Sequence, residues 1–462
     1  MIKFSRCCII NWGDNLKTED TISAIATAIG TAGIGVIRMS GEDSVEIADK
    51  IFDRDLKNAQ DRRVIFGHVK NFAGEIIDEA IILIMRAPHS YTKENVVEIQ
   101  CHGGTAALRE VLSLTYEAGA RPAERGEFTK RAFLNGRLDL TQAQAVLDVI
   151  QAKTSTALSV AQNQLSGKTS KKIRAIRQNI LEVLAHIEAL IDFPEDDIDA
   201  VFIDDIDKKI SAQIDEIKIF LDNQKSGRIL REGLETAIIG KPNVGKSSLL
   251  NFLVEDERAI VTDIPGTTRD SIEEFVNIGG VPLKIIDTAG IRNSDNPVEQ
   301  IGIERAKDCA SRAELIFALF DGSRELSDED FEILKIIDGR NAIILLTKAD
   351  LPQVIDTSQF KKFIPISVKK NLGVEKFLSA ISEKVGNVNT EMNFVRDERE
   401  ADLLRRAVKN LEEARLTLQK NIGIDFISID LRTALELLSE LTGESVTEDV
   451  INEIFSKFCV GK

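Results

Sequence analysis

Cysteines, histidines and long apolar runs are all scarce in this chain of 462 residues. Its five cysteines form no C-x-x-C pair, which argues against a disulfide framework or a structural zinc site and indicates a reducing compartment. No apolar run approaches the roughly 18 residues that a membrane span requires. The amino end "MIKFSRCCIINWGDN" lacks the small-residue cleavage site of an export signal. We therefore expect a cytoplasmic protein with no membrane partner, in which residues 1–18 are a disordered tail or a mis-assigned start.

Positive charge is also in short supply. The chain has 59 lysines and arginines against 75 acidic residues, a net charge of −16. Contacts of Lys and Arg with phosphates supply most non-specific affinity for nucleic acid. A nucleic-acid partner would therefore need a local basic patch or a helper protein. The length suggests about three domains.

The stretch "LETAIIGKPNVGKSSLLNFLV" runs from a short apolar strand into a helix. Gly240, Gly245, Lys246 and Ser247 fit the pattern G-x-x-x-x-G-K-[ST]. Glycines allow backbone N–H groups to close around phosphate oxygens, the lysine reaches the β and γ phosphates, and the serine hydroxyl is a Mg²⁺ ligand. The positive end of the following helix points at the same anions. The spacing therefore predicts a nucleotide-binding phosphate loop.

Three later stretches predict that the base is guanine. "VPLKIIDTAG" places Asp287 and Gly290 near the metal and the γ phosphate, "IILLTKAD" contains the guanine-reading Asp350, and "IPISVKK" supplies the last guanine-contacting loop. The carboxylate of Asp350 can accept from the ring N1–H and the exocyclic amine of guanine, which adenine cannot offer together. Thr347 stands where GTPases usually have asparagine. Because threonine is shorter, we expect it to lose a contact with the phosphate loop and to weaken guanine affinity.

Hydrolysis of GTP requires a group that orients the attacking water. Small GTPases usually place glutamine directly after D-x-x-G, but this chain has Ile291, which cannot orient water. Glu299, in the loop "IRNSDNPVEQIGIERA", is a candidate for this role. The alternative is that Glu299 is a solvated residue at the start of a helix.

Several motifs together resemble the MnmE (TrmE) family of tRNA-uridine modification GTPases, over essentially everything after residue 18. "GKPNVGKSSLLN" is shared with ribosome-assembly GTPases, whereas "AIVTDIPGTTRDSIEE" and "DTAGIR" with "VEQIGIERA" are more specific. Outside the GTPase segment the resemblance includes "GIGVIRMSG", "VVEIQCHGG", "GEFTKRAFLNGRLDLTQAQAV" and the final "FCVGK".

The resemblance implies a GTPase activated by K⁺-dependent pairing of two such domains in a homodimer. The side chain of Asn243, the backbone oxygens of Thr262 and Ile264, and the Thr267 position would ligate K⁺, while Ser247 and Thr268 would ligate Mg²⁺. A monovalent cation there would supply the charge of an arginine finger. Catalytic roles fall to Glu299, which would orient water, and to Lys246. The predicted GTP contacts are Asn243, Val244, Gly245, Lys246, Ser247, Ser248, Thr262, Asp263, Ile264, Pro265, Gly266, Thr267, Thr268, Asp287, Thr288, Ala289, Gly290, Thr347, Lys348, Ala349, Asp350, Ser367, Val368 and Lys369.

The periodicity of the chain predicts a multidomain fold. Short β-type runs alternate with helical stretches over residues 19–137, which indicates an α+β domain. Residues Ile173, Ile176, Ile180, Val183, Ile187 and Leu190 form a helical stripe, and "IDLRTALELLSELTG" forms another that Gly443 should end. We expect a helical domain in two parts, 138–228 and 389–462, around an inserted α/β P-loop GTPase domain at 229–388. Two independent bundles are the alternative.

The resemblance also implies a site for a one-carbon tetrahydrofolate in the amino-terminal domain. The matching positions are Arg38, Glu98, Arg137, which replaces a lysine of other members, and the terminal Lys462. A carboxylate suits the amidine-like edge of the pterin, and cations suit the glutamate tail of folate. In "FCVGK", Cys459 is a catalytic candidate or a packed thiol; a prenylation signal would require aliphatic residues after it. A catalytic pair of Cys101 and His102 is excluded, because adjacent strand residues face opposite sides.

The function implied by the resemblance is K⁺- and Mg²⁺-dependent GTP hydrolysis coupled to modification of the wobble uridine in tRNA. A carboxymethylaminomethyl or aminomethyl group would be added at C5, with carbon from methylene-tetrahydrofolate. The implied partner is an FAD-dependent protein of the MnmG (GidA) type, in a heterotetramer or larger complex, and this partner would supply much of the grip on tRNA. A ribosome-assembly GTPase that binds rRNA and a stand-alone folate-dependent methyltransferase are the alternatives.

Overall fold

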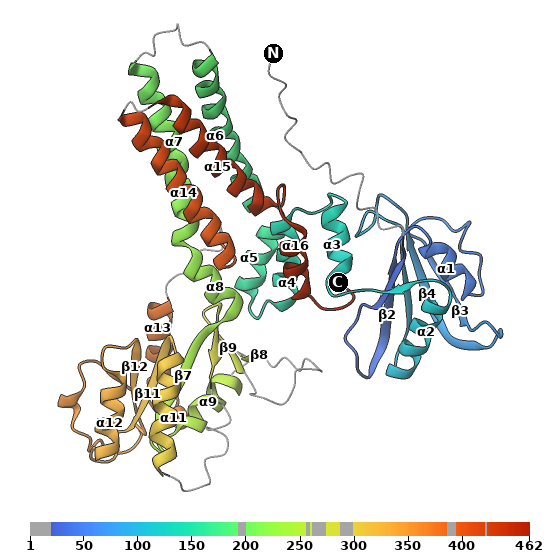
Figure 1. The fold of residues 1–462 in the computed structure, drawn as a ribbon. Coiled ribbons are helices and arrows are strands. Elements are labelled where there is room, and N and C mark those ends of the chain that lie inside the picture. The colour runs from blue at the N-terminus through green and yellow to red at the C-terminus, as the bar shows by residue number, and fades with distance from the viewer. Residues whose placement is uncertain are drawn as a thin grey trace.

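The computed structural model describes residues 20–192, 200–255, 259–260, 274–286, 299–385, 394–420 and 423–462. Figure 1 shows two sheets with their own helices and a long helical bundle. The extension expected at residues 1–18 lies outside the described residues. In the part of the chain that the structure describes, no helix is long and apolar enough to cross a membrane.

A six-stranded sheet forms the amino-terminal domain, with strand order β3-β4-β5-β2-β1-β6. Its strands are β1 (Ile22–Ile25), β2 (Ala32–Ser40), β3 (Val64–Lys70), β4 (Ile76–Met85), β5 (Val96–Gly103) and β6 (Arg121–Pro122), with helices α1 (Ser44–Lys50) and α2 (Thr105–Glu117). All neighbours are antiparallel except the parallel pair β1 and β6. Buried apolar residues of the sheet, such as Ile37 and Ile99, pack against Leu108 and Val111 of α2. The segment is therefore α+β, as the periodicity indicates.

Four short helices lie between this sheet and the bundle (Figure 1). We call them the junction helices: α3 (Glu127–Leu134), α4 (Leu140–Gln151), α5 (Ser155–Leu165) and α16 (Glu448–Ser456). Asp139 starts α4 with a capping box, in which its carboxylate accepts from the N–H of Gln142 and the Gln142 side chain accepts from the N–H of Asp139. Leu140 and Leu147 of α4 share a hydrophobic cluster with Ile451 of α16. The carboxyl end of the chain therefore returns to its first third.

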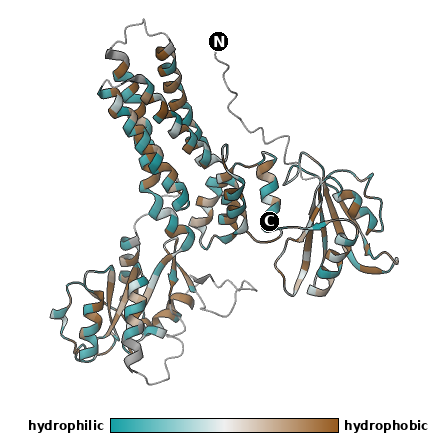
Figure 2. Cartoon of the chain, viewed as in Figure 1, coloured by the Kyte–Doolittle hydropathy of each residue, from teal (hydrophilic) through white to brown (hydrophobic). Residues whose placement is uncertain are grey.

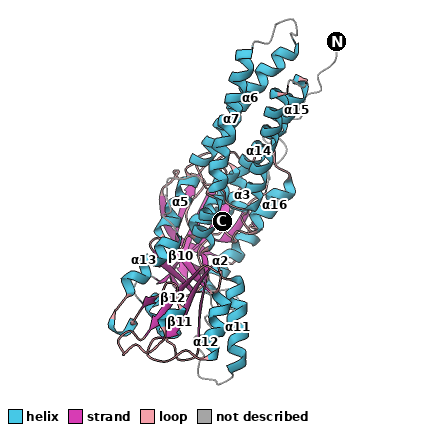
Figure 3. Cartoon of the chain, turned by 90° about the vertical axis from the view of Figure 1, so that its left-hand side faces the viewer, coloured by secondary structure: helices cyan, strands magenta, loops and turns pink. Residues whose placement is uncertain are grey.

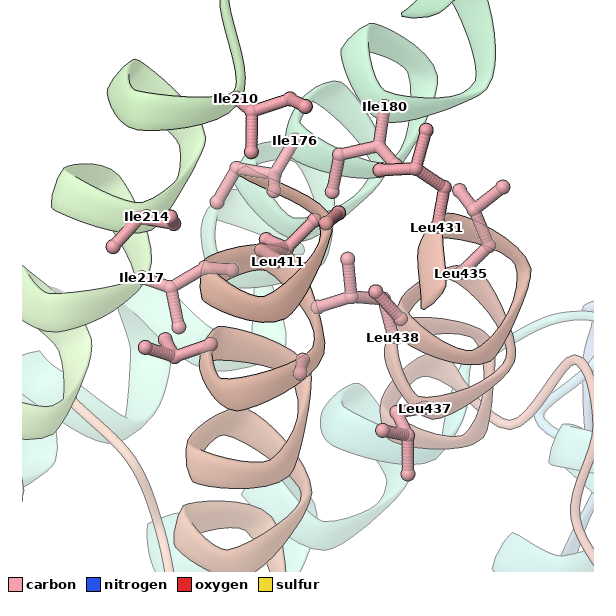
Figure 4. Packing of buried hydrophobic residues seen from close by; sticks show 14 of the residues in the cluster. Ile176, Ile180, Ile210, Ile214, Ile217, Leu411, Leu431, Leu435, Leu437 and Leu438 are labelled. Carbon is pink, nitrogen blue, oxygen red and sulfur yellow. The ribbon is translucent and has the colours of Figure 1, made fainter. Parts of the chain in front are cut away.

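The bundle consists of α6 (Lys168–Asp192), α7 (Ala200–Asp222), α14 (Glu398–Gln419) and α15 (Ile424–Thr442). Figure 4 shows Ile180, Ile210, Leu411 and Leu431 of these four helices packed together, and each is fully buried. Helix α15 ends at Gly443, whose φ of 85° suits glycine, as predicted. Residues before and after the inserted segment thus share one hydrophobic core, which fits one interrupted bundle rather than two. Figure 3 shows the bundle extending beyond both sheets.

The inserted domain is a seven-stranded sheet in the order β13-β12-β11-β7-β10-β9-β8. Its elements are β7 (Leu234–Gly240), α9 (Lys246–Glu255), β8 (Ala259–Ile260), β9 (Glu274–Ile278), β10 (Val281–Ile285), α11 (Glu299–Arg312), β11 (Leu315–Asp321), α12 (Asp328–Ile337), β12 (Ala342–Thr347), β13 (Ile364–Pro365) and α13 (Val374–Val385), with 3₁₀ turns η1 (Thr357–Gln359) and η2 (Val368–Lys370). The strands are rich in apolar residues (Figure 2) because helices cover both faces. Helices α9 and α13 pack on one face, and α11 and α12 pack on the other.

Helix α8 (Gln224–Glu232) connects the bundle to β7, so the predicted boundary at residue 228 falls inside a helix. The amide Nε2 of Gln224 donates to Oε2 of Glu398 at 2.7 Å. Arg231 donates to the carbonyl oxygen of Arg396. The entry to the inserted domain therefore lies beside the segment that leads into α14.

A second contact joins the inserted domain to the junction helices. The hydroxyl of Thr154, the N-cap of α5, donates to the carbonyl oxygen of Gly280 at 2.8 Å. Gly280 lies at the tip of the hairpin of β9 and β10. The Lys153 ammonium lies 5.3 Å from the ring centroid of Phe275 on β9. This hairpin is thus held against the start of α5.

Candidate functional site

The phosphate loop runs from the end of β7 to the start of α9. Asn243 in this loop has a φ of 60° and Gly245 a φ of 106°, both left-handed conformations that bend the backbone sharply. At Gly240 a Cβ atom would lie 2.7 Å from the carbonyl oxygen of Leu319 on β11. Only glycine fits there, which is the physical reason for the first glycine of the motif.

Lys246 is largely buried under this loop. Its ammonium donates to the carbonyl oxygens of Gly240 at 2.7 Å and of Lys241 at 2.8 Å. Burial lowers the pKa of Lys246 to about 8. A lysine whose ammonium has lost much of its water binds an incoming phosphate strongly, because the phosphate restores the lost charge stabilisation. Ser247 and Ser248 follow in the first turn of α9, as the motif requires.

Thr347 corrects one of our expectations. Its hydroxyl donates to the carbonyl oxygen of Val244 at 2.7 Å and also lies 3.1 Å from the carbonyl oxygen of Phe320. The contact with the phosphate loop that we expected threonine to lose is therefore present. The reason is that the end of β12 lies close enough to the loop for the shorter side chain to reach it.

The residues predicted to contact guanine gather where β11, β12 and β13 end. Lys348, with a φ of 56°, pairs with Asp321 at 2.6 Å. Burial opposes ionisation of Asp321, but hydrogen bonds from Lys348 and Ser323 outweigh it and lower the pKa of Asp321. Asp350 is exposed, and a hydrogen bond with the Ser367 hydroxyl is the main cause that lowers its pKa. The carboxylate of Asp350 therefore stays ionised, as an acceptor for two donors must.

The loop after β13 completes this edge. The N–H of Ala349 donates to the carbonyl oxygen of Ile366 at 3.2 Å, and Ser367 caps the 3₁₀ turn that contains Val368 and Lys369. The structure thus brings together the predicted contacts at 243–248, 347–350 and 367–369. The predicted contacts at 262–268 and 287–290 lie outside the described residues, as does Ile291. Glu299 begins α11, but its side chain is not among those described.

A second site forms around Arg38 and Glu98, which face each other across β2 and β5. Nε and Nη2 of Arg38 lie 2.9 and 2.8 Å from Oε1 of Glu98. The guanidinium of Arg38 also lies 5.7 Å from the ring centroid of Tyr91 and 5.8 Å from that of Phe128. Arg137 lies on Tyr91 as well, at 4.7 Å. Two cations, one carboxylate and an aromatic ring are therefore gathered at one place.

The carboxyl tail of the chain reaches this second site. Arg38 donates to the carbonyl oxygen of Gly461 at 3.4 Å, and the N–H of Gly126 donates to that of Cys459 at 3.2 Å. Burial, assisted by the charge of Arg38, lowers the pKa of Lys462, against the opposing effect of Glu98. All four residues predicted for folate are thus brought together. We call Arg38, Tyr91, Glu98, Arg137 and Lys462 the tail site.

Sequence reasoning missed Tyr91 and Phe128. The hydroxyl of Tyr91 lies 2.9 Å from that of Thr129, which fixes its ring beside the two arginines. Tyr91 is one of only two tyrosines in the chain, and this rarity was a usable signal. Neither aromatic residue lies in a recognisable spacing with Arg38, because Tyr91 is in a loop and Phe128 is in α3.

Cys101 and His102, which are neighbours in the sequence, have very different environments. Cys101 is 4% exposed, and burial raises the pKa of its thiol to about 11, whereas the His102 side chain is 69% exposed and pairs with Asp78. The two side chains face opposite sides of the sheet, which confirms that they cannot act as a pair. The Cys459 side chain is exposed. Among the described residues, no group of three or more His, Cys, Asp or Glu could hold a metal ion.

The fold and the first site define a P-loop GTP-binding protein whose nucleotide domain is inserted into a helical bundle. Residues 21–137 match the family model of the "GTP-binding protein TrmE N-terminus", and residues 140–459 match that of the "MnmE helical domain". The chain belongs to the MnmE (TrmE) family.

Relatives named "tRNA modification GTPase MnmE" match almost the whole chain. Those of Alkaliphilus oremlandii and Clostridioides difficile are 44% and 46% identical, each over 96% of this chain and 99% of their own length. That of Desulforamulus reducens is 47% identical over 96% of this chain and its full length. Among solved structures, the G domain of the Thermotoga maritima FeoB iron transporter is 21% identical and covers 33% of this chain and 99% of its own, with a TM-score of 0.25. A likeness at that score supports no conclusion about function.

Proposed function

We propose that this protein is a GTP-hydrolysing enzyme of tRNA modification. With a flavoprotein of the MnmG type, it would add a carboxymethylaminomethyl or aminomethyl group to C5 of the wobble uridine. The observation that carries the proposal is that one chain contains both the phosphate loop and the tail site, with Lys462 and Gly461 seated beside Arg38 and Glu98. Relatives that match 96% of this chain have the name of a tRNA modification GTPase.

The proposed roles in nucleotide binding start from the phosphate loop. Lys246 would bind the β and γ phosphates, the loop N–H groups would surround them, and Asp350 with Ser367 would select guanine. Ser247 and Thr268 would hold Mg²⁺. Asn243 would hold K⁺ with the backbone of Thr262 and Ile264 and the Thr267 position. The two cations supply charge neutralisation for the transferred phosphoryl group. Glu299 would orient the attacking water, since Ile291 cannot.

For the folate, the chemistry of the tail site fits a pterin. Both contacts that Arg38 makes with Glu98 use Oε1, so Oε2 would accept from the amidine-like edge of a pterin ring. The Tyr91 ring holds the guanidinium groups of Arg38 and Arg137 beside Glu98, and Arg137 and Lys462 are cations suited to the carboxylates of the glutamate tail. A tetrahydrofolate that carries one carbon would supply that carbon for the modification. The thiol of Cys459, which is exposed near Lys462, is either a participant or a packing group.

The proposed assembly is a cytoplasmic homodimer that works with the flavoprotein. Because the chain is acidic overall, the partner would contribute to the binding affinity for tRNA. GTP hydrolysis would drive opening and closing of the paired domains and would not take part in the carbon chemistry.

Two experiments test the proposal. Nucleoside analysis of tRNA from cells that lack this protein should show loss of the C5 substituent, restored by the wild-type gene. Unchanged nucleosides would favour a role in ribosome assembly instead. Titration with 5-formyl-tetrahydrofolate should give saturable binding that Arg38→Ala abolishes. Arg63→Ala, which removes an exposed arginine of the same domain that contacts Gln60, is the control. Binding that survives Arg38→Ala would refute the folate assignment.

A further inference from the structure

The first three turns of α6 hold an unusual concentration of positive charge. The segment "KTSKKIRAIR" at residues 168–177 contains five cations and no acidic residue, and the first acidic residue of α6 is Glu182. This occurs in a chain with a net charge of −16. Cations at the amino end of a helix are unfavourable, because the helix dipole is positive there. The positive charge of the first turn therefore gains nothing from the helix dipole.

The cations of α6 differ in how far they are neutralised. Arg174 pairs with Asp139 at 3.0 Å and with Glu444 at 3.4 Å, and Arg177 lies 3.8 Å from Glu444. Lys168 donates to the uncharged amide oxygen of Asn163 and forms no ion pair within the described ranges. Lys171 and Lys172 are exposed, and neither forms an ion pair with any residue that the structure describes. At least three positive charges of this segment are thus free to meet an anion.

Arg174 connects this segment to the neighbourhood of the tail site. Asp139, which binds Arg174, comes two residues after the exposed Arg137, whose guanidinium covers Tyr91. Lys93 also lies near Arg137, because its ammonium donates to the carbonyl oxygens of the two preceding residues, Asn135 and Gly136, both at 3.0 Å. On the helix surface, Lys171 neighbours Lys168 and Arg174, each three residues away, and Lys172 neighbours Lys168, four residues away. We call Lys93, Arg137, Lys168, Lys171, Lys172 and Arg174 the basic arc.

We propose that the basic arc binds the sugar–phosphate backbone of tRNA beside the tail site. This inference rests on the proposed function, because it takes tRNA as the substrate. A uridine that accepts carbon at the tail site has a phosphate on its 5′ side and another on its 3′ side. These phosphates must meet the protein close to that site. Lysines bind phosphates as point charges, and arginines can also stack on unpaired bases of an RNA loop. The arc supplies the local basic patch that an acidic chain requires.

The test is the binding of unmodified tRNA to the full chain between 50 and 200 mM KCl. Lys171→Gln with Lys172→Gln removes two cations, neither of which belongs to the tail site. We expect about tenfold weaker binding and a salt dependence that is shallower by about one to two ions. The control is Lys208→Gln with Lys209→Gln, which removes the same charge from two neighbouring exposed lysines on α7 of the same bundle, of which Lys209 pairs with Asp205 at 2.7 Å. Lys171→Arg with Lys172→Arg keeps the charge and should bind as the wild type does.

Each outcome decides the proposal. Unchanged tRNA affinity of the glutamine variant overturns it, and so does an equal loss in the Lys208 and Lys209 control, which would indicate net charge alone. Absence of tRNA binding by the wild-type chain also overturns it. If tRNA binding is kept but association with the flavoprotein weakens, the arc is a protein interface and not an RNA surface. None of these results refutes tRNA modification, because nucleoside analysis of the deletion strain tests that function separately.

Discussion

Replacement of Gly461 by alanine should detach the carboxyl tail from the tail site. Gly461 has a φ of 90°, and a Cβ atom there would overlap the carbonyl oxygen of Ile25 and lie 3.1 Å from Cα of Ala26. Those atoms belong to the backbone at the end of β1, so they cannot move aside as a flexible side chain can. A side chain in such a strained conformation costs about 1–3 kcal/mol before the overlap is counted.

The tail has few interactions with which to oppose this strain. Its carbonyl oxygens accept from Gly126 at 3.2 Å and from Arg38 at 3.4 Å, and each such bond contributes about 0.5–1.5 kcal/mol. A loss of about 2 kcal/mol lowers the docked fraction relative to the detached one roughly 30-fold. Lys462 would then leave Arg38 and Glu98.

The assay is titration of Gly461→Ala with 5-formyl-tetrahydrofolate, together with its rate of GTP hydrolysis. We expect folate affinity to fall at least about tenfold while GTP hydrolysis is unchanged. Gly74→Ala is the matched control, because Gly74 has a φ of 85° but no atom within 4 Å of the added Cβ. Wild-type folate affinity in Gly461→Ala, or an equal loss of GTP hydrolysis, would refute the reasoning. By the same reasoning, a tag after Lys462 should impair modification more than GTP hydrolysis.

Four further predictions concern the nucleotide site. GTP turnover should be several-fold faster in KCl than in NaCl, and Asn243→Ala should remove the difference; equal wild-type rates would exclude Asn243 from a cation site. Glu299→Ala should slow turnover about 100-fold at unchanged GTP affinity, whereas a collapse of affinity would make Glu299 structural. Burial lowers the pKa of Lys246 to about 8, and a bound triphosphate favours the charged amine. GTP affinity measured by calorimetry should therefore fall as the pH rises above about 8, by up to about tenfold per pH unit; a pH dependence that persists in Lys246→Arg contradicts this. Thr347→Val removes the hydrogen bond to Val244 and should weaken GTP binding roughly 2- to 10-fold, with Thr347→Ser unaffected; equal affinities would mean that the contact contributes nothing.

The fold could be predicted from the sequence wherever residues close together in the chain decide the local structure. The stripe that includes Ile173 and Ile180 identified α6, and Gly443 marked the end of α15, because both features depend on neighbours within one helix. The phosphate loop was equally accessible, because the spacing from Gly240 to Lys246 fixes backbone geometry directly.

The features of the two sites that the sequence did not predict depend on distances between segments far apart in the chain. Thr347 was expected to fall short of the phosphate loop, and nothing in its local sequence gives the 2.7 Å between its hydroxyl and Val244. Tyr91 and Phe128 reach Arg38 through a loop and a helix that have no common period with β2. For the tail site, the residue types were given by resemblance, and only the packing of α16 against α4 explains how Lys462 can arrive there.

The attachment of the inserted domain has a mechanical consequence. The chain enters through α8 and rejoins the bundle before α14, and these two places lie side by side, joined by Gln224 and Glu398. A body held at two neighbouring points keeps one easy rotation, about the line through them. The hydrogen bond from Thr154 to Gly280 and the Lys153 contact with Phe275 are further attachments that oppose the rotation. They contribute about 1–3 kcal/mol together. We therefore expect the inserted domain to swing mainly about this line, restrained by contacts weak enough to break and re-form at ordinary temperature.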